Sequence, residues 1–514
     1  MSLKRNLLFN YAAFIYSIAA SIVMLPLYLE FLDAEAYGLV GFAALVNTWL
    51  GLLTIGIAPV VIRQVAHYRG LGDLWCREFQ VLFRSLELAT VALAALAALL
   101  AWVAAPWLAA HWLTVKLLPL DQVGHCVALM GLTTSIRWCS SLYSSSLSAM
   151  ERQVWLGGAN MVFSTLRYVA IYGFLRWVST APVHYFEFQL AVSLAELGLL
   201  GWKHYAVQRA ESDSSGVGLA FSWPALRGIG GFAGGITYTS LLWVLMTQTD
   251  KLILSHALPL AEYGYLALIT VIANGLLQLT GPINQAVLPR MTMFHSQGNG
   301  PALIGLYRKT TQYTSLLVFA VAGGVALYPQ ALIYALSGNA DAGRWGASIL
   351  FWFALGNAIL VVAGMQYFLQ YAHGQLRVHV INTTINAAIQ VPVLAWLALH
   401  YGALAVAVGW FVLRCGAFAV WPAIVHSKLA PGMHWGWLCK DVLQPLAGIA
   451  AGLLIANGCL AGQMGAQPSR WGIIGAVMAA GSLALLCGAL AAPDSWQALK
   501  HLILRAKARY VNRS

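Results

Sequence analysis

The sequence contains very little charge. Asp, Glu, Lys and Arg make up 9% of its 514 residues, whereas 60% of the residues are hydrophobic. Ordinary soluble domains are roughly 25% charged. Apolar stretches of about 20 residues recur along the chain, and this length crosses a hydrocarbon core of roughly 30 Å. The composition therefore excludes a soluble protein and predicts an all-α polytopic membrane protein.

The sequence also lacks the usual marks of an enzyme or a metalloprotein. Its seven cysteines stand singly, and none forms a CxxC pair or a Cys/His cluster with metal-ligand spacing. No P-loop or catalytic-triad motif occurs. The longest stretches between apolar runs, 62–80, 203–227 and 289–310, are too short for a soluble domain. We therefore expect a transporter that is not an ATPase, with no catalytic residues, no metal and no cofactor.

Hydropathy predicts about fourteen membrane spans. The fourth is the most polar, because it contains the stretch "LTTSIRWCSSLYSSS". The predicted spans are 9–30, 37–61, 81–104, 122–149, 155–177, 184–202, 228–249, 262–288, 311–335, 345–371, 378–399, 402–425, 442–461 and 471–491.

The distribution of basic residues predicts the orientation of these spans. An even number of spans places both termini on one side. With a cytoplasmic N-terminus, most of the 29 Lys and Arg face the cytoplasm, as the positive-inside rule requires. The formal net charge of +12 therefore reports topology and gives no reason to expect a nucleic-acid partner. The exceptions are Lys116, Arg176, Lys251, Arg344 and Arg470 on the outer side, and Arg137, Arg167 and Arg414 within spans.

The C-terminal tail, 492–514, combines apolar residues at helical spacing with basic residues. One interpretation is a helix that lies on anionic membrane lipid. The other is a solvated basic tail, and the sequence leaves both open.

A short text occurs twice. "LDAEAYGL" at 32–39 returns as "LPLAEYGY" at 258–265, and Asn47 aligns with Asn274 after a one-residue slip. We expect Gly to permit a tight turn and Tyr to lie at the headgroup level. The match predicts two parallel six-helix repeats. These are an N-lobe over 1–205 and a C-lobe over 228–428, joined by a cytoplasmic linker at 206–227, with spans 13 and 14 appended over 429–491.

Several stretches carry a family resemblance: "KRNLLFNY", "PLYLEFLDAEAYG", "GIAPVVIR" and "TDKLILSHALPLAEYGYLAL". Together they resemble the polysaccharide-transport family of oligosaccharide flippases, which includes O-antigen flippases. This family belongs to the superfamily that also holds multidrug antiporters and lipid II flippases. Asp250 and Lys251 stand where the family has an Asp followed by a basic residue.

The resemblance implies a V-shaped twin-lobe transporter in the bacterial inner membrane. It would move undecaprenyl-pyrophosphate-linked oligosaccharide units from the cytoplasmic to the periplasmic leaflet by alternating access. The product would be O-antigen, capsule or exopolysaccharide. The implied partners are the lipid-linked oligosaccharide, a polysaccharide polymerase and a chain-length regulator.

The charges within spans give the candidate site residues. An ionised residue there costs about 2.5–3.5 kcal/mol on insertion scales, so each one needs a reason. Arg137, Arg167 and Arg414 could line a cationic cavity for pyrophosphate or acidic sugars, since guanidinium binds such groups in a fork. They could equally form internal ion pairs with Glu87, Glu187 or Glu196.

Polar residues near these arginines complete the candidate set. Ser141 and Ser144 lie in the hydroxyl-rich fourth span, which indicates either a wet face or close helix packing. Asn274 and Gln278 lie in span 8. Asp250, Lys251 and Glu196 are candidates for a coupling role or for structural ion pairs.

Two other functions stay open. A multidrug or cation antiporter of the same superfamily would require acidic residues in its cavity. A membrane glycosyltransferase or polymerase that uses lipid-linked sugars could take Glu30, Asp33 or Glu35 as catalytic carboxylates. Such enzymes commonly need a larger outer loop than this sequence provides.

Overall fold

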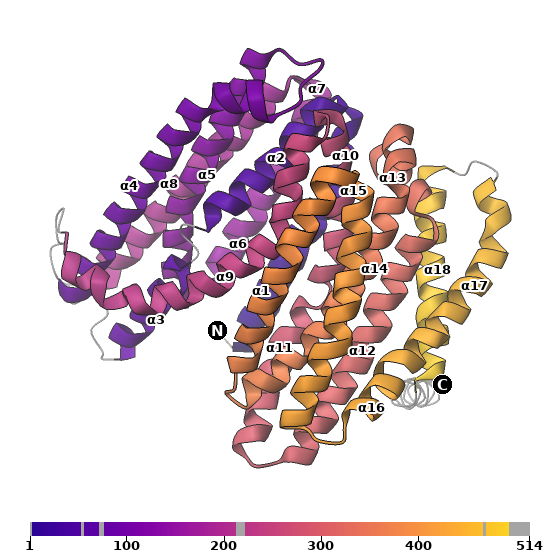
Figure 1. The fold of residues 1–514 in the computed structure, drawn as a ribbon. Helices are drawn as coiled ribbons and strands as arrows, with labels where there is room; N and C mark the ends of the chain where they lie inside the picture. Colours follow the sequence, from indigo (N-terminus) through magenta and orange to yellow (C-terminus); the bar gives the residue numbers. More distant parts are fainter. Residues whose placement is uncertain (1–2, 53–55, 71–76, 212–220, 466–468, 493–514) are drawn as a thin grey trace, which may run out of the picture. The chain divides into compact units, whose positions relative to one another are not determined.

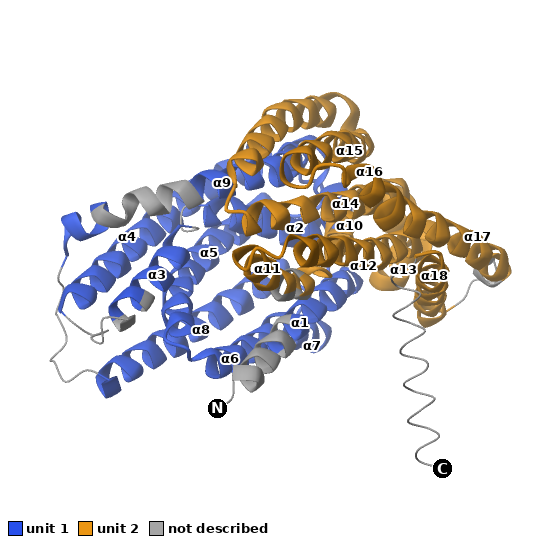
Figure 2. Ribbon diagram, turned by 90° about the horizontal axis from the view of Figure 1, so that it is seen from below, with its two compact units in different colours: residues 1–267 blue, residues 268–514 orange. Residues whose placement is uncertain are grey.

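A computed structural model describes residues 3–52, 56–70, 77–211, 221–465 and 469–492. The chain divides into two compact units, Met1–Ala267 and Leu268–Ser514, which are coloured separately in Figure 2. We describe each unit by itself. The predicted lobe boundaries at 205 and 228 stay predictions, and the tail from 493 onward lies outside the described residues.

Unit 1 consists of helices (Figure 1). In chain order they are α1 (Leu3–Leu27), the short 3-10 helix η1 (Tyr28–Glu30), α2 (Ala34–Gly51), α3 (Ile57–Gly70), α4 (Arg77–Trp107), π-helical η2 (Leu108–Trp112), α5 (Leu120–Ala149), α6 (Gln153–Ser164), π-helical η3 (Thr165–Ala170), α7 (Ile171–Trp177), α8 (Pro182–Glu211) and α9 (Trp223–Ala257).

Helix α10 (Leu260–Gln278) begins in unit 1 and continues into unit 2. Unit 2 then contains α11 (Gly281–Ser296), α12 (Gly300–Leu327), α13 (Pro329–Ser337), α14 (Ala340–Ala372), α15 (Arg377–Leu429), α16 (His434–Trp437), π-helical η4 (Leu438–Leu443), α17 (Gln444–Gly465) and α18 (Arg470–Ala491).

The predicted spans coincide with these helices. The polar fourth span is α5, which runs unbroken from Leu120 to Ala149. Among the described residues, seven helices are long and apolar enough to cross a membrane. The all-helical membrane fold is therefore confirmed, whereas the number of fourteen spans stays a prediction.

Helix α15 contains two predicted spans, which meet at Gly402. This residue has φ 75° and ψ −166°, in the left-handed half of backbone space that glycine tolerates best. At about 1.5 Å of rise per residue, each half of α15 is long enough to cross a hydrocarbon core of about 30 Å.

Residues with suitable side chains set several helix ends. Ser222, Asn299, Asn339 and Ser469 lie at N-caps, and the side-chain oxygen of each accepts a backbone N–H of the first turn. Gly338, with φ 71°, ends α13.

The second predicted span and the eighth each correspond to two helices. α2 is followed by α3, and α10 is followed by α11 after Leu279 and Thr280. α11 begins with Gly281 and Pro282, and Pro suits a first helical turn because it has no N–H to satisfy. Discontinuous helices at corresponding positions of two repeats are typical of transporters.

The repeated Tyr-Gly pair lies where α2 and α10 cross. A Cβ on Gly38 would lie 2.2 Å from the Leu260 carbonyl oxygen, and one on Gly264 would lie 2.6 Å from the Ala34 carbonyl oxygen. Both glycines are helical, and Tyr37 and Tyr263 are buried. The expectation of glycines in a tight turn was therefore wrong, whereas the headgroup level of the tyrosines stays a prediction. The repeat preserves a close helix crossing.

The segment 112–118, between η2 and α5, is bound on two sides. The buried Glu35 carboxylate accepts the backbone N–H groups of Lys116, Leu117 and Leu118 at 2.8, 2.9 and 3.0 Å. The Thr114 carbonyl accepts the Leu260 N–H at 3.0 Å. Glu35 is thus fully engaged as an acceptor of backbone hydrogen bonds, which argues against a catalytic role.

The appended helices pack on α12 of unit 2. The Arg308 Nε and a terminal guanidinium nitrogen donate to the two Asp441 carboxylate oxygens at 2.6 and 3.1 Å. Tyr307 and His426 share a hydrogen bond of 2.8 Å in the buried layer beneath Trp437. A bidentate pair of this kind fixes η4 on α12.

We expect alanine at Gly38 or Gly264 to destabilise the protein. The added Cβ would force α2 and α10 apart, and overpacking costs about 1–3 kcal/mol. Thermal unfolding of the purified protein in detergent measures the effect. Gly198→Ala on α8 is the matched control, because no atom lies within 4 Å of its new Cβ. Unchanged unfolding midpoints at Gly38 and Gly264 would contradict the crossing.

Glu35→Ala should release segment 112–118. Three backbone N–H groups lose their charged acceptor, and a hydrogen bond to a charged group contributes about 1.5–3 kcal/mol. Hydrogen–deuterium exchange of residues 116–118 should become faster. The control is Asp33→Ala, which removes the same charge from an exposed neighbouring position. Equal exchange in both variants would show that Glu35 does not hold the segment.

Candidate functional site

Unit 1 encloses a polar cavity of about 310 Å³. Five elements contribute to its wall: α1, α2, α5, η3 and α8. The lining residues are Leu25, Val40, Ala43, Ala44, Asn47, Thr48, Met130, Thr133, Thr134, Arg137, Arg167, Tyr168, Tyr185, Phe186 and Gln189. Two of the three predicted arginines therefore lie at one cavity.

Helical periodicity explains which residues face the cavity. On α5 they are Met130, Thr133, Thr134 and Arg137, which follow the i, i+3, i+4, i+7 pattern of one helix face. On α2 the cavity residues, from Val40 to Thr48, follow the same spacing. The wall of the cavity thus combines apolar side chains with hydroxyl, amide and guanidinium groups.

The two cavity arginines differ in their partners. Arg167 forms an ion pair with Glu196 of α8, and both side chains are mostly buried. Arg137 is half-buried, and among the described residues no carboxylate lies within ion-pairing distance of it. Of the three glutamates considered as partners, Glu196 holds Arg167, whereas Glu87 binds Arg84, Tyr143 and Tyr205 instead. Arg137 therefore leaves the cavity with an unneutralised guanidinium.

Arg167 lies on the π-helical turn η3, whose backbone is held by side chains. The Arg167 carbonyl accepts from Gln189 Nε2 at 3.1 Å, and the Tyr168 carbonyl accepts from the Tyr28 hydroxyl at 2.8 Å. Tyr16 shares a further hydrogen bond of 2.7 Å with Thr165. Single π-turns within helices occur frequently at functional sites. Here the turn positions the Arg167 guanidinium at the cavity.

The serines predicted for the site lie elsewhere on α5. Ser141 and Ser144 are absent from the cavity wall, and the Ser141 hydroxyl donates to the Trp138 carbonyl of its own helix at 2.7 Å. Ser145 donates in the same way to the Ser141 carbonyl at 2.7 Å. The hydroxyl-bearing residues of α5 that line the cavity are Thr133 and Thr134, at least two turns earlier than the predicted serines.

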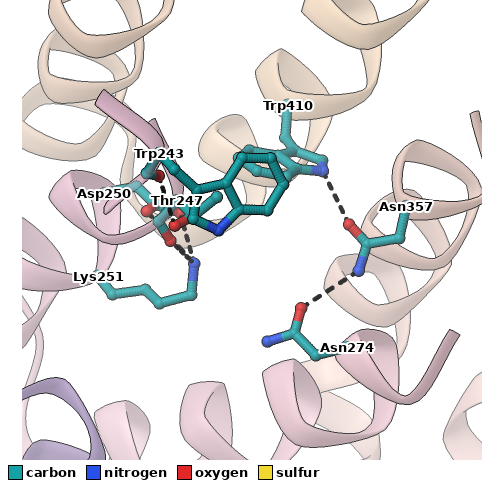
Figure 3. Close-up of polar contacts among 7 residues, drawn as sticks. All are labelled: Trp243, Thr247, Asp250, Lys251, Asn274, Asn357 and Trp410. Carbon is teal, nitrogen blue, oxygen red and sulfur yellow. Dashed lines mark hydrogen bonds and ion pairs between the residues drawn. The ribbon is translucent and has the colours of Figure 1, made fainter. Parts of the chain in front are cut away.

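A second polar cluster lies in unit 2 (Figure 3). Asn357 of α14 donates from Nδ2 to the Asn274 side-chain oxygen at 3.4 Å and accepts from Trp410 Nε1 at 3.2 Å. The Arg414 guanidinium carbon lies 4.2 Å from the centroid of the Trp410 ring. The cluster thus connects the predicted residues Asn274 and Arg414. Gln278 lies one turn further along α10 and is exposed.

Asn357 and Trp410 are absent from the predicted site residues. A single amide within the apolar stretch "FALGNAIL" was the available signal for Asn357, because a polar residue in a membrane span needs a reason. Trp410 offered no signal, since the sequence has twenty tryptophans and most suit a membrane interface.

Asp250 and Lys251 of α9 form a local pair in unit 1 (Figure 3). Lys251 Nζ lies 3.3 Å from one carboxylate oxygen of the buried Asp250 and donates to the Thr247 carbonyl at 2.7 Å. The pair neutralises the buried carboxylate. A coupling role for Asp250 stays a prediction.

Comparison with known proteins agrees with this architecture. Residues 211–342 match the model of a family described as "Polysaccharide biosynthesis protein". A lipid II flippase, MurJ, in an inward closed conformation matches at a TM-score of 0.68 and 9% identity, over 94% of this chain and 98% of that one. An inward-facing multidrug-resistance MATE transporter of the MOP superfamily matches at 0.66 and 14% identity, over 81% and 95%.

The chain shares the fold of this flippase and this MATE transporter. A further MOP-superfamily transporter, from Pyrococcus furiosus and described as having a binding pocket of reversed polarity, matches at a TM-score of 0.51 and 12% identity, over 81% and 96% of the two chains. No curated protein matches the sequence. These solved structures, at 9–14% identity, show that the chain shares the fold of two transporters and a lipid II flippase.

Proposed function

We propose that this chain is a flippase for undecaprenyl-pyrophosphate-linked oligosaccharides. It would move repeat units from the cytoplasmic to the periplasmic leaflet of a bacterial inner membrane, with both termini cytoplasmic. The units would serve the assembly of O-antigen, capsule or exopolysaccharide. The observation that carries the proposal is Arg137, a guanidinium at the cavity for which the described residues provide no carboxylate within ion-pairing distance.

The charge of the cavity favours an anionic substrate. An unneutralised guanidinium in a low-dielectric wall attracts an oxyanion strongly and binds it in a fork. The threonine, asparagine and glutamine side chains beside it can bond sugar hydroxyls. The membrane potential also assists an outward-moving anion, by about 2.3 kcal/mol per charge per 100 mV.

The match over 211–342 supports a substrate from polysaccharide biosynthesis, and the MurJ-like fold supports the flipping of a lipid-linked precursor. The implied partners, namely the lipid-linked oligosaccharide, a polymerase, a chain-length regulator and anionic lipid, belong to the same proposal.

A multidrug or cation antiporter is the second candidate, because a MATE transporter shares the fold. Its cavity would have to attract cations. The cavity of unit 1 holds two arginines against the Glu196 carboxylate, so its sign favours anions. A glycosyltransferase or polymerase is less well supported, since the Glu35 carboxylate accepts three backbone hydrogen bonds.

Translocation in proteoliposomes tests the proposal. Wild-type protein should move a lipid-linked oligosaccharide to the opposite leaflet, where an added enzyme or lectin can reach it. Arg137→Gln should slow the rate by about 10-fold or more, because a charged hydrogen bond contributes about 1.5–3 kcal/mol. Arg176→Gln is the matched control, since Arg176 stacks on Trp177 away from the cavity.

Two outcomes would contradict the proposal. Equal translocation rates in Arg137→Gln and Arg176→Gln would show that the cavity does not lie on the transport path. Failure of wild-type protein to move a lipid-linked oligosaccharide, together with export of a cationic dye, would instead establish the antiporter.

A further inference from the structure

The Arg167–Glu196 pair stands beside a cavity that already contains one unpaired guanidinium. Arg167 lines the cavity and Glu196 does not, so the carboxylate reaches the arginine from behind the wall. We propose that Glu196 is an internal competitor that a transported oxyanion partly displaces from Arg167. This inference rests on the proposed function and deepens it, because it assigns a residue that sets how firmly the substrate is held.

The geometry leaves Arg167 able to take a second partner. A guanidinium carries five N–H donors in a fixed fork, and one carboxylate engages at most a part of them. The Arg167 Nε is buried and makes no hydrogen bond among the described residues. Glu196 pairs with one terminal nitrogen of the guanidinium, so other donors of this cavity-lining side chain can take a second partner.

The three charged groups act on one another. Both the Arg167 guanidinium and the Glu196 carboxylate lie close enough to Arg137 to affect it electrostatically, with opposite signs. Together the three groups carry one net positive charge in a region of low dielectric. An oxyanion that binds Arg137 neutralises this excess, and its remaining oxygens then compete with Glu196 for Arg167.

Competition of this kind suits transport. A transported ligand has to bind well enough to enter and weakly enough to leave. When the oxyanion departs, Arg167 can form its ion pair with Glu196 again. Release therefore does not leave a second guanidinium without a counter-charge. Without the carboxylate, both guanidiniums would hold the oxyanion and release would slow.

The ligand chemistry is an oxyanion that accepts hydrogen bonds from two guanidiniums. A pyrophosphate and a uronic-acid carboxylate both fit this description. Inorganic pyrophosphate and glucuronate are soluble probes that separate the two sources.

Equilibrium binding of each probe to the purified full-length protein in detergent tests the inference. Glu196→Gln keeps the shape of the side chain and removes its charge, so the affinity for at least one probe should rise by about 10-fold, the size of one added charge-assisted contact. The double variant Arg167→Gln/Glu196→Gln should return the affinity to the wild-type value. Glu187→Gln, an exposed carboxylate on the same helix, is the matched control and should change nothing.

An affinity in Glu196→Gln that stays the same or falls would overturn the inference, as would absence of binding by all variants. If Glu196→Gln does not fold, Glu196→Asp keeps the charge on a shorter side chain and should raise the affinity by a smaller factor. An unchanged affinity in that variant would also overturn the inference.

Translocation by the same proteins separates the two proposals. Glu196→Gln should bind more tightly yet flip more slowly than wild type. If the wild-type protein flips a lipid-linked oligosaccharide but Glu196→Gln does not bind the probes more tightly, the proposed flippase function is supported and the competitor role of Glu196 is rejected. If Glu196→Gln binds the probes more tightly but the wild-type protein does not flip the lipid-linked oligosaccharide, the competition for Arg167 is supported and the flippase function is rejected.

Discussion

The cost of placing charge in a layer without water governs this structure. An ionised side chain there is tolerated when a partner of opposite charge or a set of hydrogen bonds compensates for the lost water. Buried acidic groups in both units obey this constraint. Glu35 accepts three backbone N–H groups, and the pairs Asp250–Lys251, Arg308–Asp441 and Arg84–Glu87 neutralise one another. The Glu35 contacts and the Arg308–Asp441 pair also join separate helices or segments.

Among the described residues, Arg137 has no such partner of opposite charge, and it makes the cavity cationic. Its guanidinium reaches a space lined by hydroxyl and amide groups, while the neighbouring Arg167 is balanced by Glu196. A fold shared by multidrug transporters and a lipid II flippase can carry pockets of different sign, so the cavity residues decide which ligand is favoured. The guanidinium groups beside hydroxyl and amide groups are the basis for proposing an oxyanion that carries sugars.

Much of the fold could be predicted because a membrane helix is recognisable from the composition of its own stretch of sequence. Apolar length predicted the helical membrane fold, including α5 in spite of its serines, whereas the two six-helix repeats stay a prediction. The role of the two glycines was predicted wrongly. The close approach between α2 and α10 is a contact between residues far apart in the sequence. Nothing in the residues around Gly38 predicts that Leu260 lies beside it.

The site was predictable in part for the same reason. Arg137 and Arg167 were found because charge within a span is conspicuous, and the spacing along α5 explains why Thr133 and Thr134 accompany Arg137. The choice of Glu196 over Glu187 as the partner of Arg167 depends on how α8 faces η3, and the π-turn alters that geometry. Ser141 and Ser144 were predicted from composition, yet the Ser141 hydroxyl bonds its own helix backbone instead of facing the cavity.

The most direct measurement is an experimental structure of the protein in lipid with an undecaprenyl-pyrophosphate-linked oligosaccharide bound. We predict density for an oxyanion within hydrogen-bonding distance of the Arg137 guanidinium, with sugar density beside Thr133, Thr134 or Gln189. A head group bound elsewhere, with the cavity of unit 1 holding water alone, would contradict the account.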